Sequence, residues 1–576
     1  MTKREKLTAL AFLIIFALGA FPRLVGLNWD QDQHLHPDER FLTMVGMDIK
    51  WPKNIKEYLN TRLSPLNPYN QGHSFFVYGT LPLFLNKKLA LVLNHDNYDD
   101  FNLLGRQLAA FFDLGTLILV GLSAKKLLPG KNWLWAPFFY SISVLPIQLA
   151  HFFTVDPFLN FFLVLAFLFL VDAQKSNRPF WLGLSGIALG AALACKASAA
   201  LFCPLILFFL ILKLKKEKSL QNFFIRGIVF SLTCFFSFRL FQPYAFTGLI
   251  KPNPQFLANL AELRSYQNPA STYPPSLQWV KNNHLFFPAK NLFLFGLGPI
   301  LGIISLLSFS LTPLSFFKKR KNLFLAFAWF MVLEIFVFHG LQFAKPSRYF
   351  LTCFPFLCLT NAYFINSSVF LGKKKLSPKL LKAALFSLII ILLVWPLSFL
   401  RIYCQPHSRI TASAWIYQHL PTGATLSCEY WDDCLPLFLP NNNPAAYQKE
   451  IIDFYPPDDA QKWQKINQQL AKVDFLIISS NRVWKPMMEN PERYPQTAQF
   501  YQDLFAGRLA WEKLAEFTSY PGFPPFGKPW FIFKDEEAEE SFTVYDHPRV
   551  IIFQKTQETK EEQNSLSSSN RKTFTK

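Results

Sequence analysis

The sequence predicts a polytopic all-α membrane domain followed by a small α/β domain. The 576 residues are 51% hydrophobic and only 17% charged, with 65 Phe, a composition too apolar for a water-soluble chain of this length. Apolar stretches of about 20 residues, the length of a bilayer-spanning helix, recur up to about Leu400. Beyond that point the chain becomes polar and carries short β-branched runs. We therefore expect about eleven transmembrane helices and a separate C-terminal domain.

The expected spans are apolar segments separated by short polar or basic connections. They are Leu7–Leu27, Leu104–Leu122, Trp133–Ala150, Phe152–Val171, Trp181–Cys195, Ala197–Leu212, Phe223–Phe241, Leu292–Leu311, Leu323–Leu341, Tyr349–Phe364 and Ala383–Leu400. The apolar segment 75–94 is interrupted by Gly79, Pro82 and a Lys pair. We expect helices lying in the membrane interface there, rather than a further span.

Basic residues predict the orientation, because Lys and Arg near span ends are retained on the cytoplasmic side. Any two successive basic clusters are separated by an even number of expected spans. The clusters are Lys3–Lys6, Lys125–Lys131, Lys175–Arg178, Lys213–Lys218, Lys318–Lys321 and Lys373–Lys382. This pattern predicts a multi-pass plasma-membrane protein with a cytoplasmic N-terminus. The loops 28–100 and 242–290, and everything after Leu400, are then extracytoplasmic.

The expected domains are a membrane domain over 1–403, whose first outer loop is 28–100, and an extracytoplasmic α/β domain over 404–555. In the latter, Ala412–His419 and Ala460–Leu470 have helical patterns, while Ala424–Cys428, Val473–Ser479 and Arg549–Gln554 read as strands. Residues 556–576 lack an apolar pattern, which predicts a disordered tail. Cys428 and Cys434 could form a disulfide if the compartment is oxidising.

The net charge of +20 does not by itself indicate a nucleic-acid partner. Much of the basic excess lies in the short inner loops, where it serves topology and contact with anionic membrane lipids. We therefore expect membrane lipids, and no nucleic acid, as partners of these residues.

The stretch Asp30–Leu42, DQDQHLHPDERFL, places an unusual polar cluster directly after the first span. One explanation is purely structural, since Pro37 suits the first position of a helix and Asp38 and Glu39 then suit its first turn. A second explanation is a divalent-metal site formed by His34, His36, Asp38 and Glu39, although the sequence requires no cofactor. The location, on the outer membrane face, favours a functional role.

Charged residues within or beside spans are costly and usually mark function or pair with one another. Arg106 and Asp113 share one helix face, and we expect structural pairing for both. Taken one at a time, each of the remaining Lys and Arg residues is explained as a long side chain that extends to place its charge at the membrane surface. The topology, however, brings six residues to the outer side of the membrane: Asp38, Glu39, Asp156, Lys196, Arg239 and Arg348. Such a mixture of acids and cations suits a reaction on an anionic lipid headgroup.

The order of these motifs resembles the GT-C superfamily of integral-membrane glycosyltransferases. The motifs are the acidic pair after the first span, the DP that opens the span at Asp156, the Gly-rich span that ends at Lys196, SRYF at 347–350 with FPF at 354–356, and a C-terminal outer domain. In particular, they are similar to the protein O-mannosyltransferase and lipid A aminoarabinose transferase type, the phospholipid-carrier-dependent or family 39-like enzymes. The resemblance covers about 1–403.

The resemblance implies an inverting transfer of a sugar from a polyprenyl-phosphate carrier to a glycan, lipid or protein acceptor on the extracytoplasmic face. It implies that Asp38, with Glu39 beside it, is the general base that takes the proton of the acceptor hydroxyl. A departing phosphate needs fixed positive charge, for which Lys196 and Arg348 are the candidates, with Arg239 behind them. Asp156 is a candidate second acid, and His36, Asp38 and Glu39 are the candidate ligands if a metal is present.

The sequence departs from part of this superfamily. Residues 429–433, EYWDD, lack the paired Trp and the Tyr-Gly of the WWDYG motif found in the oligosaccharyltransferase branch. This difference disfavours transfer of a preassembled oligosaccharide to Asn.

Two other classes of function stay open at the level of sequence. A transporter or flippase of lipid-linked sugars would use the same cations to hold phosphate, although we find no internal repeat of the kind that alternating access favours. A non-catalytic envelope assembly protein would leave the intramembrane charges unexplained.

Overall fold

The computed structural model describes residues 2–176, 178–269, 273–282, 284–318, 323–367 and 377–556. The chain forms two compact units. Unit 1 comprises Met1–Asn28, His36–Gln267 and His284–Leu400, and unit 2 comprises Trp29–Leu35, Asn268–Asn283 and Arg401–Lys576. Apart from Thr556, the tail expected to be disordered lies outside the described residues.

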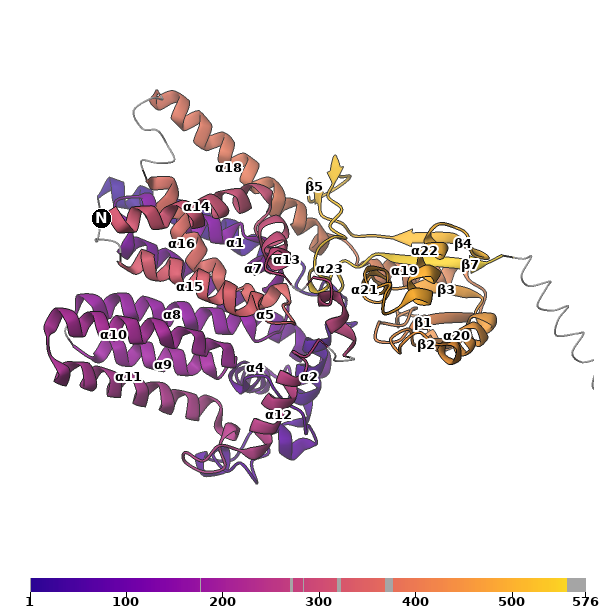
Figure 1. Ribbon diagram of the computed structural model, residues 1–576, viewed down its shortest axis with the longest axis horizontal. Helices are drawn as coiled ribbons and strands as arrows, with labels where there is room; N and C mark the ends of the chain where they lie inside the picture. The colour runs from indigo at the N-terminus through magenta and orange to yellow at the C-terminus, as the bar shows by residue number, and fades with distance from the viewer. Residues whose placement is uncertain are drawn as a thin grey trace, which may run out of the picture. The chain divides into compact units, whose positions relative to one another are not determined.

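Unit 1 is helical (Figure 1). Its longer helices are α1 (Lys3–Leu24), α2 (Pro37–Asp48), α4 (Thr80–Leu93), α5 (Tyr98–Leu127), α8 (Asp156–Lys175), α9 (Phe180–Leu193), α10 (Cys203–Glu217), α11 (Leu220–Phe241), α12 (Pro254–Ser265), α14 (Pro299–Lys318), α15 (Leu323–Gly340), α16 (Cys353–Asn366) and α18 (Pro378–Leu400). Shorter helices are α3 (Ile55–Tyr58), α6 (Trp135–Ser141), α7 (Val144–Leu149), α13 (Phe286–Lys290), η3 (Ala197–Phe202) and η7 (Ser347–Phe350).

Helix is present in each of the segments that we expected to span the membrane. Among the residues that the structure describes, seven runs are long and apolar enough to cross a bilayer, so the chain is a multi-pass membrane protein. They are Lys3–Leu24, Tyr98–Leu127, Asp156–Lys175, Ala197–Glu217, Leu220–Phe241, Leu323–Gly340 and Lys379–His419. Phe180–Leu193 and Pro299–Leu314 are apolar but shorter. The expected number of spans is therefore not confirmed, although the helical membrane fold is.

Close packing in unit 1 depends on small residues. Helix α9 lies between α8 and α11 (Figure 1), and its glycines face α11. A Cβ added to Gly190 would lie 2.4 Å from the Cys234 carbonyl oxygen and one added to Gly186 would lie 2.6 Å from that of Phe230. Small residues at such interfaces let helix backbones approach closely in a membrane. The Gly-rich sequence of α9 is thereby explained by packing.

Unit 2 contains a five-stranded mixed sheet in the order β2-β1-β3-β7-β4. The strands are β1 (Thr425–Glu429), β2 (Gln448–Ile452), β3 (Phe475–Ile478), β4 (Trp511–Phe517) and β7 (Val550–Lys555). Strand β1 is parallel to β2 and β3, whereas β7 is antiparallel to β3 and β4. A separate hairpin pairs β5 (Gly522–Phe523) with β6 (Phe531–Ile532). The predicted α/β class of the C-terminal part is confirmed.

Helices pack on the sheet of unit 2 and bury its apolar residues. They are α19 (Ser408–His419), α20 (Ala460–Lys472), α21 (Trp484–Glu489), α22 (Pro495–Phe505) and α23 (Glu540–Thr543). One core cluster includes Ile466, Leu476 and Phe553, and a second includes Ile416, Leu426 and Ile552. Cys428, near the end of β1, forms a disulfide with Cys434, a pairing that the sequence left open.

Candidate functional site

Asp38 lies in the first turn of α2, whose first residue is Pro37. Pro at this position and an acid in the first turn both favour the start of a helix. The Asp38 carboxylate forms an ion pair with the Arg348 guanidinium and accepts a hydrogen bond of 3.0 Å from the Tyr78 hydroxyl. Both charged side chains keep partial exposure, 17% for Asp38 and 20% for Arg348. This acid is therefore held in place without being sealed from solvent.

A second acid–cation pair joins two more of the expected residues. Lys196 Nζ donates to Asp156 Oδ1 at 2.8 Å. The same ammonium lies 3.9 Å from the centre of the Tyr349 ring, a distance at which the ring face attracts a cation. Because Tyr349 follows Arg348 in η7, its ring connects the two pairs. Asp38, Arg348, Lys196 and Asp156 thus come from separate segments of unit 1 to one cluster, which we call the paired-charge cluster.

Backbone contacts fix the segment that carries Tyr78 against the turn that carries Lys196. Gly79 N–H donates to the Cys195 carbonyl at 3.1 Å, and Leu81 N–H donates to that of Ala194 at 3.2 Å. A Cβ added at Gly79 would lie 2.1 Å from the Ala194 oxygen, so only glycine permits this approach. Tyr78 is thereby held beside the turn, where its hydroxyl reaches Asp38.

Glu39 has different surroundings from Asp38, although the two are adjacent. Its side chain is fully buried and pairs with Arg106 through two bonds, 3.0 Å to Nε and 2.7 Å to Nη2. The Phe153 N–H donates to the same carboxylate at 2.5 Å, and Arg106 also donates to the Leu27 carbonyl. Paired Arg–carboxylate bonds of this kind fix geometry. The arrangement assigns Glu39 to holding α2 against α5.

Asp113, the other acid on α5, pairs with a cation from the first helix. Arg23 Nε donates to Asp113 at 2.6 Å, and the Tyr140 hydroxyl donates to the same carboxylate. Arg23 also donates to the Ser141 and Gly19 carbonyls. These pairs agree with the expected structural role of Arg106 and Asp113.

Arg239 lies in the last turn of α11 and donates hydrogen bonds to backbone carbonyls. Its partners are the carbonyls of Pro243 at 3.2 Å, Gly248 at 2.9 Å and Leu249 at 3.3 Å. No contact among the described residues joins it to the paired-charge cluster. The structure places Arg239 as a support of the loop after α11.

The residues expected to hold a metal do not form a ligand group. Among the described residues, no three His, Cys, Asp or Glu side chains are arranged to hold a metal ion. Asp38 and Glu39 point to different arginines, and the centre of the His36 ring lies 4.6 Å from that of Phe152. The chain's own residues at this point therefore do not fit the metal interpretation.

Three aromatic residues around the cluster were not predicted as site residues. Tyr78 bonds Asp38, Tyr349 lies under Lys196, and His339 packs 5.5 Å from the Tyr349 ring, measured between ring centres. The sequence offered one signal, since Tyr349 directly follows Arg348 in SRYF. Tyr78 and His339 carried none, because one lies in an apolar segment and the other near the end of an apolar helix.

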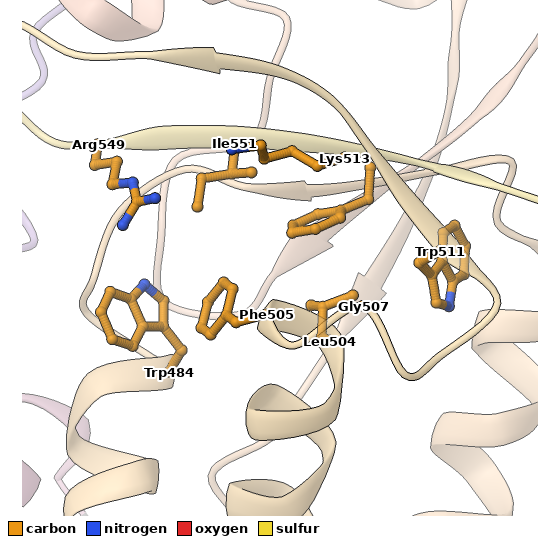
Figure 2. Close-up of a pocket in the computed structure, with 9 residues that line it drawn as sticks. Trp484, Leu504, Phe505, Gly507, Trp511, Lys513, Arg549 and Ile551 are labelled. Atoms are coloured by element: carbon orange, nitrogen blue, oxygen red, sulfur yellow. The ribbon is translucent and has the colours of Figure 1, made fainter.

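Unit 2 has its own cavity of about 350 Å³, between α21, α22 and the β4–β7 edge of the sheet (Figure 2). Trp484 and Phe505 reach from the helices toward Arg549 and Ile551. The cationic groups at its edge are already paired. Arg549 binds Glu516 at 2.9 Å and Glu536 at 3.2 Å, while Lys513 binds Glu516 at 3.0 Å. The wall of this cavity is therefore mainly apolar and aromatic, and acids neutralise its two cations.

Comparison with known proteins gives a family match over part of the chain and a likeness in fold to a solved structure. Residues 104–240 match the family described as dolichyl-phosphate-mannose-protein mannosyltransferase. No curated protein matches the chain. The archaeal oligosaccharyltransferase AglB from Archaeoglobus fulgidus, solved with an inhibitory peptide and a dolichol-phosphate, is 10% identical, with 86% of this chain and 72% of that chain covered and a TM-score of 0.50.

A second solved structure of this kind is ArnT from Cupriavidus metallidurans bound to undecaprenyl phosphate. It is 13% identical, with 95% of this chain and 97% of that chain covered and a TM-score of 0.41. The family match over 104–240 and the fold shared with the archaeal enzyme confirm the predicted resemblance to the GT-C superfamily.

Proposed function

We propose that this protein is an inverting glycosyltransferase that moves a sugar from a polyprenyl-phosphate carrier to an acceptor on the extracytoplasmic face of the membrane. The observation that carries the proposal is the paired-charge cluster, in which two cations and a partly exposed acid meet within a membrane unit. The family matched by residues 104–240 and the dolichol-phosphate bound by the structurally similar archaeal enzyme support a lipid-phosphate donor.

Arg348 and Lys196 are the groups that would bind the donor phosphate. Among the described residues Arg348 Nε is buried and has no hydrogen-bond partner, and an unsatisfied buried donor is costly. A phosphate oxygen would supply that partner, and guanidinium is suited to phosphate. Lys196 adds a second positive charge, which Asp156 and the Tyr349 ring hold in position. As the bond from the anomeric carbon to the phosphate oxygen breaks, these charges stabilise the negative charge on the leaving group.

Asp38 is the proposed general base. The acceptor hydroxyl gives its proton to the Asp38 carboxylate while its oxygen forms a bond to the anomeric carbon. The bond to the carrier oxygen breaks with its electron pair, and polyprenyl phosphate leaves from the opposite side, which inverts the configuration. Arg348 contacts Asp38. A donor phosphate competes for the same guanidinium and so frees the carboxylate, while Tyr78 continues to orient it.

The other residues expected in the site receive supporting roles in this proposal. Asp156 orients Lys196, Glu39 holds Arg106, and Arg239 supports the loop after α11. The mechanism routes no step through a metal. The acceptor in this proposal is a glycan, a lipid or a protein.

The test is mass spectrometry of membrane lipids from cells that lack the protein, with and without complementation by the wild type. We expect a polyprenyl-phosphate sugar to accumulate in the null cells and to clear on complementation, and its mass would identify the class of sugar. Unchanged carrier lipids in the null cells would contradict the proposal.

A further inference from the structure

The hairpin Pro521–Lys534 of unit 2 exposes an unusual set of aromatic and apolar side chains. Trp530 is 78% exposed, the highest value among the large hydrophobic residues described, and Phe526 and Ile532 are 57% and 55% exposed. The strands β5 and β6 project from the five-stranded sheet of unit 2 (Figure 1). Clustered exposed apolar groups of this kind mark interaction surfaces.

The hairpin is an ordered element rather than a loose loop. Trp530 N–H donates to the Phe523 carbonyl at 2.7 Å, and Phe533 N–H donates to that of Pro521 at 2.9 Å. The Phe523 and Phe531 rings stack with centres 5.6 Å apart. The exposed side chains are therefore presented by a small, internally supported scaffold.

Arg401 fixes the tip of the hairpin. Its guanidinium donates to the Gly527 carbonyl at 2.7 Å and to the Pro525 carbonyl at 3.4 Å. Arg401 follows Leu400, the last residue of α18, by one peptide bond. Helix α18 has 23 residues, which at about 1.5 Å per residue suffices to cross the hydrocarbon core of a bilayer of about 30 Å. Arg401 therefore lies where a span leaves the membrane, and the tip that it binds lies within one side-chain length of that level.

The composition of the hairpin suits the region between lipid headgroups and acyl chains. Trp and other aromatic residues are enriched at membrane interfaces. Lys528 and Lys534 flank Trp530 and are exposed, and neither contacts an acid among the described residues. Basic residues at this level attract anionic lipid headgroups.

We propose that the hairpin Pro521–Lys534 is an interfacial membrane anchor, which inserts Trp530 and Phe526 into the bilayer leaflet at which α18 ends and places Lys528 and Lys534 among anionic headgroups. This anchor ties unit 2 to the membrane surface and is independent of the transfer reaction. In this proposal the exposed side chains of the hairpin contact the lipid bilayer rather than a protein partner.

The test uses the full chain in nanodiscs of phosphatidylglycerol and phosphatidylethanolamine. A photoreactive benzoylphenylalanine replaces Trp530 in one variant and Phe526 in a second, so that failure of one variant to fold does not leave the question open. Leu514, on β4 and 42% exposed, is replaced in the matched control. After irradiation, mass spectrometry identifies what the hairpin peptide has bound.

We expect phospholipid adducts on the hairpin peptide at 530 and 526, at least tenfold above the level at 514. Cross-links only to protein, from this chain or another, would overturn the anchor. So would lipid adducts no more frequent than at the control position.

Discussion

Arg348 contacts the carboxylate of Asp38 although 310 residues separate them in the chain. The contact joins η7 to the first turn of α2. The ammonium of Lys196 lies over the ring of Tyr349, which directly follows Arg348. Because a donor phosphate would compete with the Asp38 carboxylate for the Arg348 guanidinium, phosphate binding and the availability of the proposed base are linked. The proposed mechanism depends on that competition.

Lys196→Met should weaken stabilisation of the leaving phosphate. Because the charge acts mainly as the carrier bond breaks, we expect kcat to fall by about 10²–10³-fold. Lys87→Met is the matched control, since Lys87 pairs with Asp96 at the same 2.8 Å outside the paired-charge cluster. The measurement is the rate of transfer from a polyprenyl-phosphate sugar in nanodiscs. Equal losses in the two variants would show that the effect of Lys196 is structural.

Glu39→Gln should damage the fold rather than the chemistry. It leaves Arg106 buried with its ion pair broken, and loss of one partner of a buried pair costs about 3–5 kcal/mol. We expect a lower midpoint of thermal unfolding in detergent and less protein in the membrane, while each folded molecule keeps transfer activity. A stable Glu39→Gln protein without activity would instead make Glu39 catalytic.

The disulfide between Cys428 and Cys434 reports the side of the membrane on which unit 2 lies. If that side is oxidising, both thiols should resist alkylation in intact cells and react only after reduction. The disulfide closes a loop with a sequence separation of only 6, so its removal by paired Ser substitutions should cost about 2 kcal/mol. Alkylation of both cysteines without reduction would contradict the extracytoplasmic assignment.

Glu429 should make the stability of unit 2 depend on pH. Burial raises the pKa of this carboxyl to about 8 despite the hydrogen bond from Tyr501, which lowers it. In the unfolded chain the Glu429 carboxyl loses its proton near its ordinary pKa of 4.5, whereas in the folded chain it keeps the proton up to a pKa of about 8. The free energy of unfolding therefore falls as the pH rises from about 4.5 to about 8. The slope is about 1.4 kcal/mol per pH unit.

Glu429→Gln should remove that contribution. The unfolding midpoint of the variant should exceed that of the wild type by an amount that grows from pH 5.5 to pH 7.5. Parallel midpoint curves for the two proteins would mean that the Glu429 carboxyl does not titrate in this way.

The helical elements of unit 1 could be predicted because apolar runs reveal buried or lipid-facing helices without reference to their neighbours. The partners of their charges could not, since Asp38 meets Arg348, and Glu39 meets Arg106, only after the bundle has packed. The topology predicted from the sequence put Asp38, Lys196 and Arg348 on the same side of the membrane. It did not separate Asp38 from Glu39, because adjacent helix positions face different neighbours.

The strands of the sheet in unit 2 could also be predicted only in part. Strands β1, β3 and β7 lie inside the sheet, and their patterns predicted them. Strands β3 (FLII) and β7 (VIIFQK) have apolar runs, whereas β1 (TLSCE) alternates apolar and polar residues. Strands β2 (QKEII) and β4 (WEKLAEF) form the two edges and carry exposed charges. Charges on edge strands are a common protection against unwanted pairing, and they weaken the apolar pattern that indicates a strand.

The role of Asp38 as general base is tested most directly by carrier-lipid mass spectrometry in null cells complemented with Asp38→Asn. The matched control is Asp48→Asn, on the same helix, where the side chain is 54% exposed and binds His73. Loss of a general base costs about 10²–10⁴-fold in rate. We predict that the polyprenyl-phosphate sugar persists with Asp38→Asn, at wild-type protein level in the membrane, and clears with Asp48→Asn. Clearance by Asp38→Asn at the wild-type rate would contradict the account.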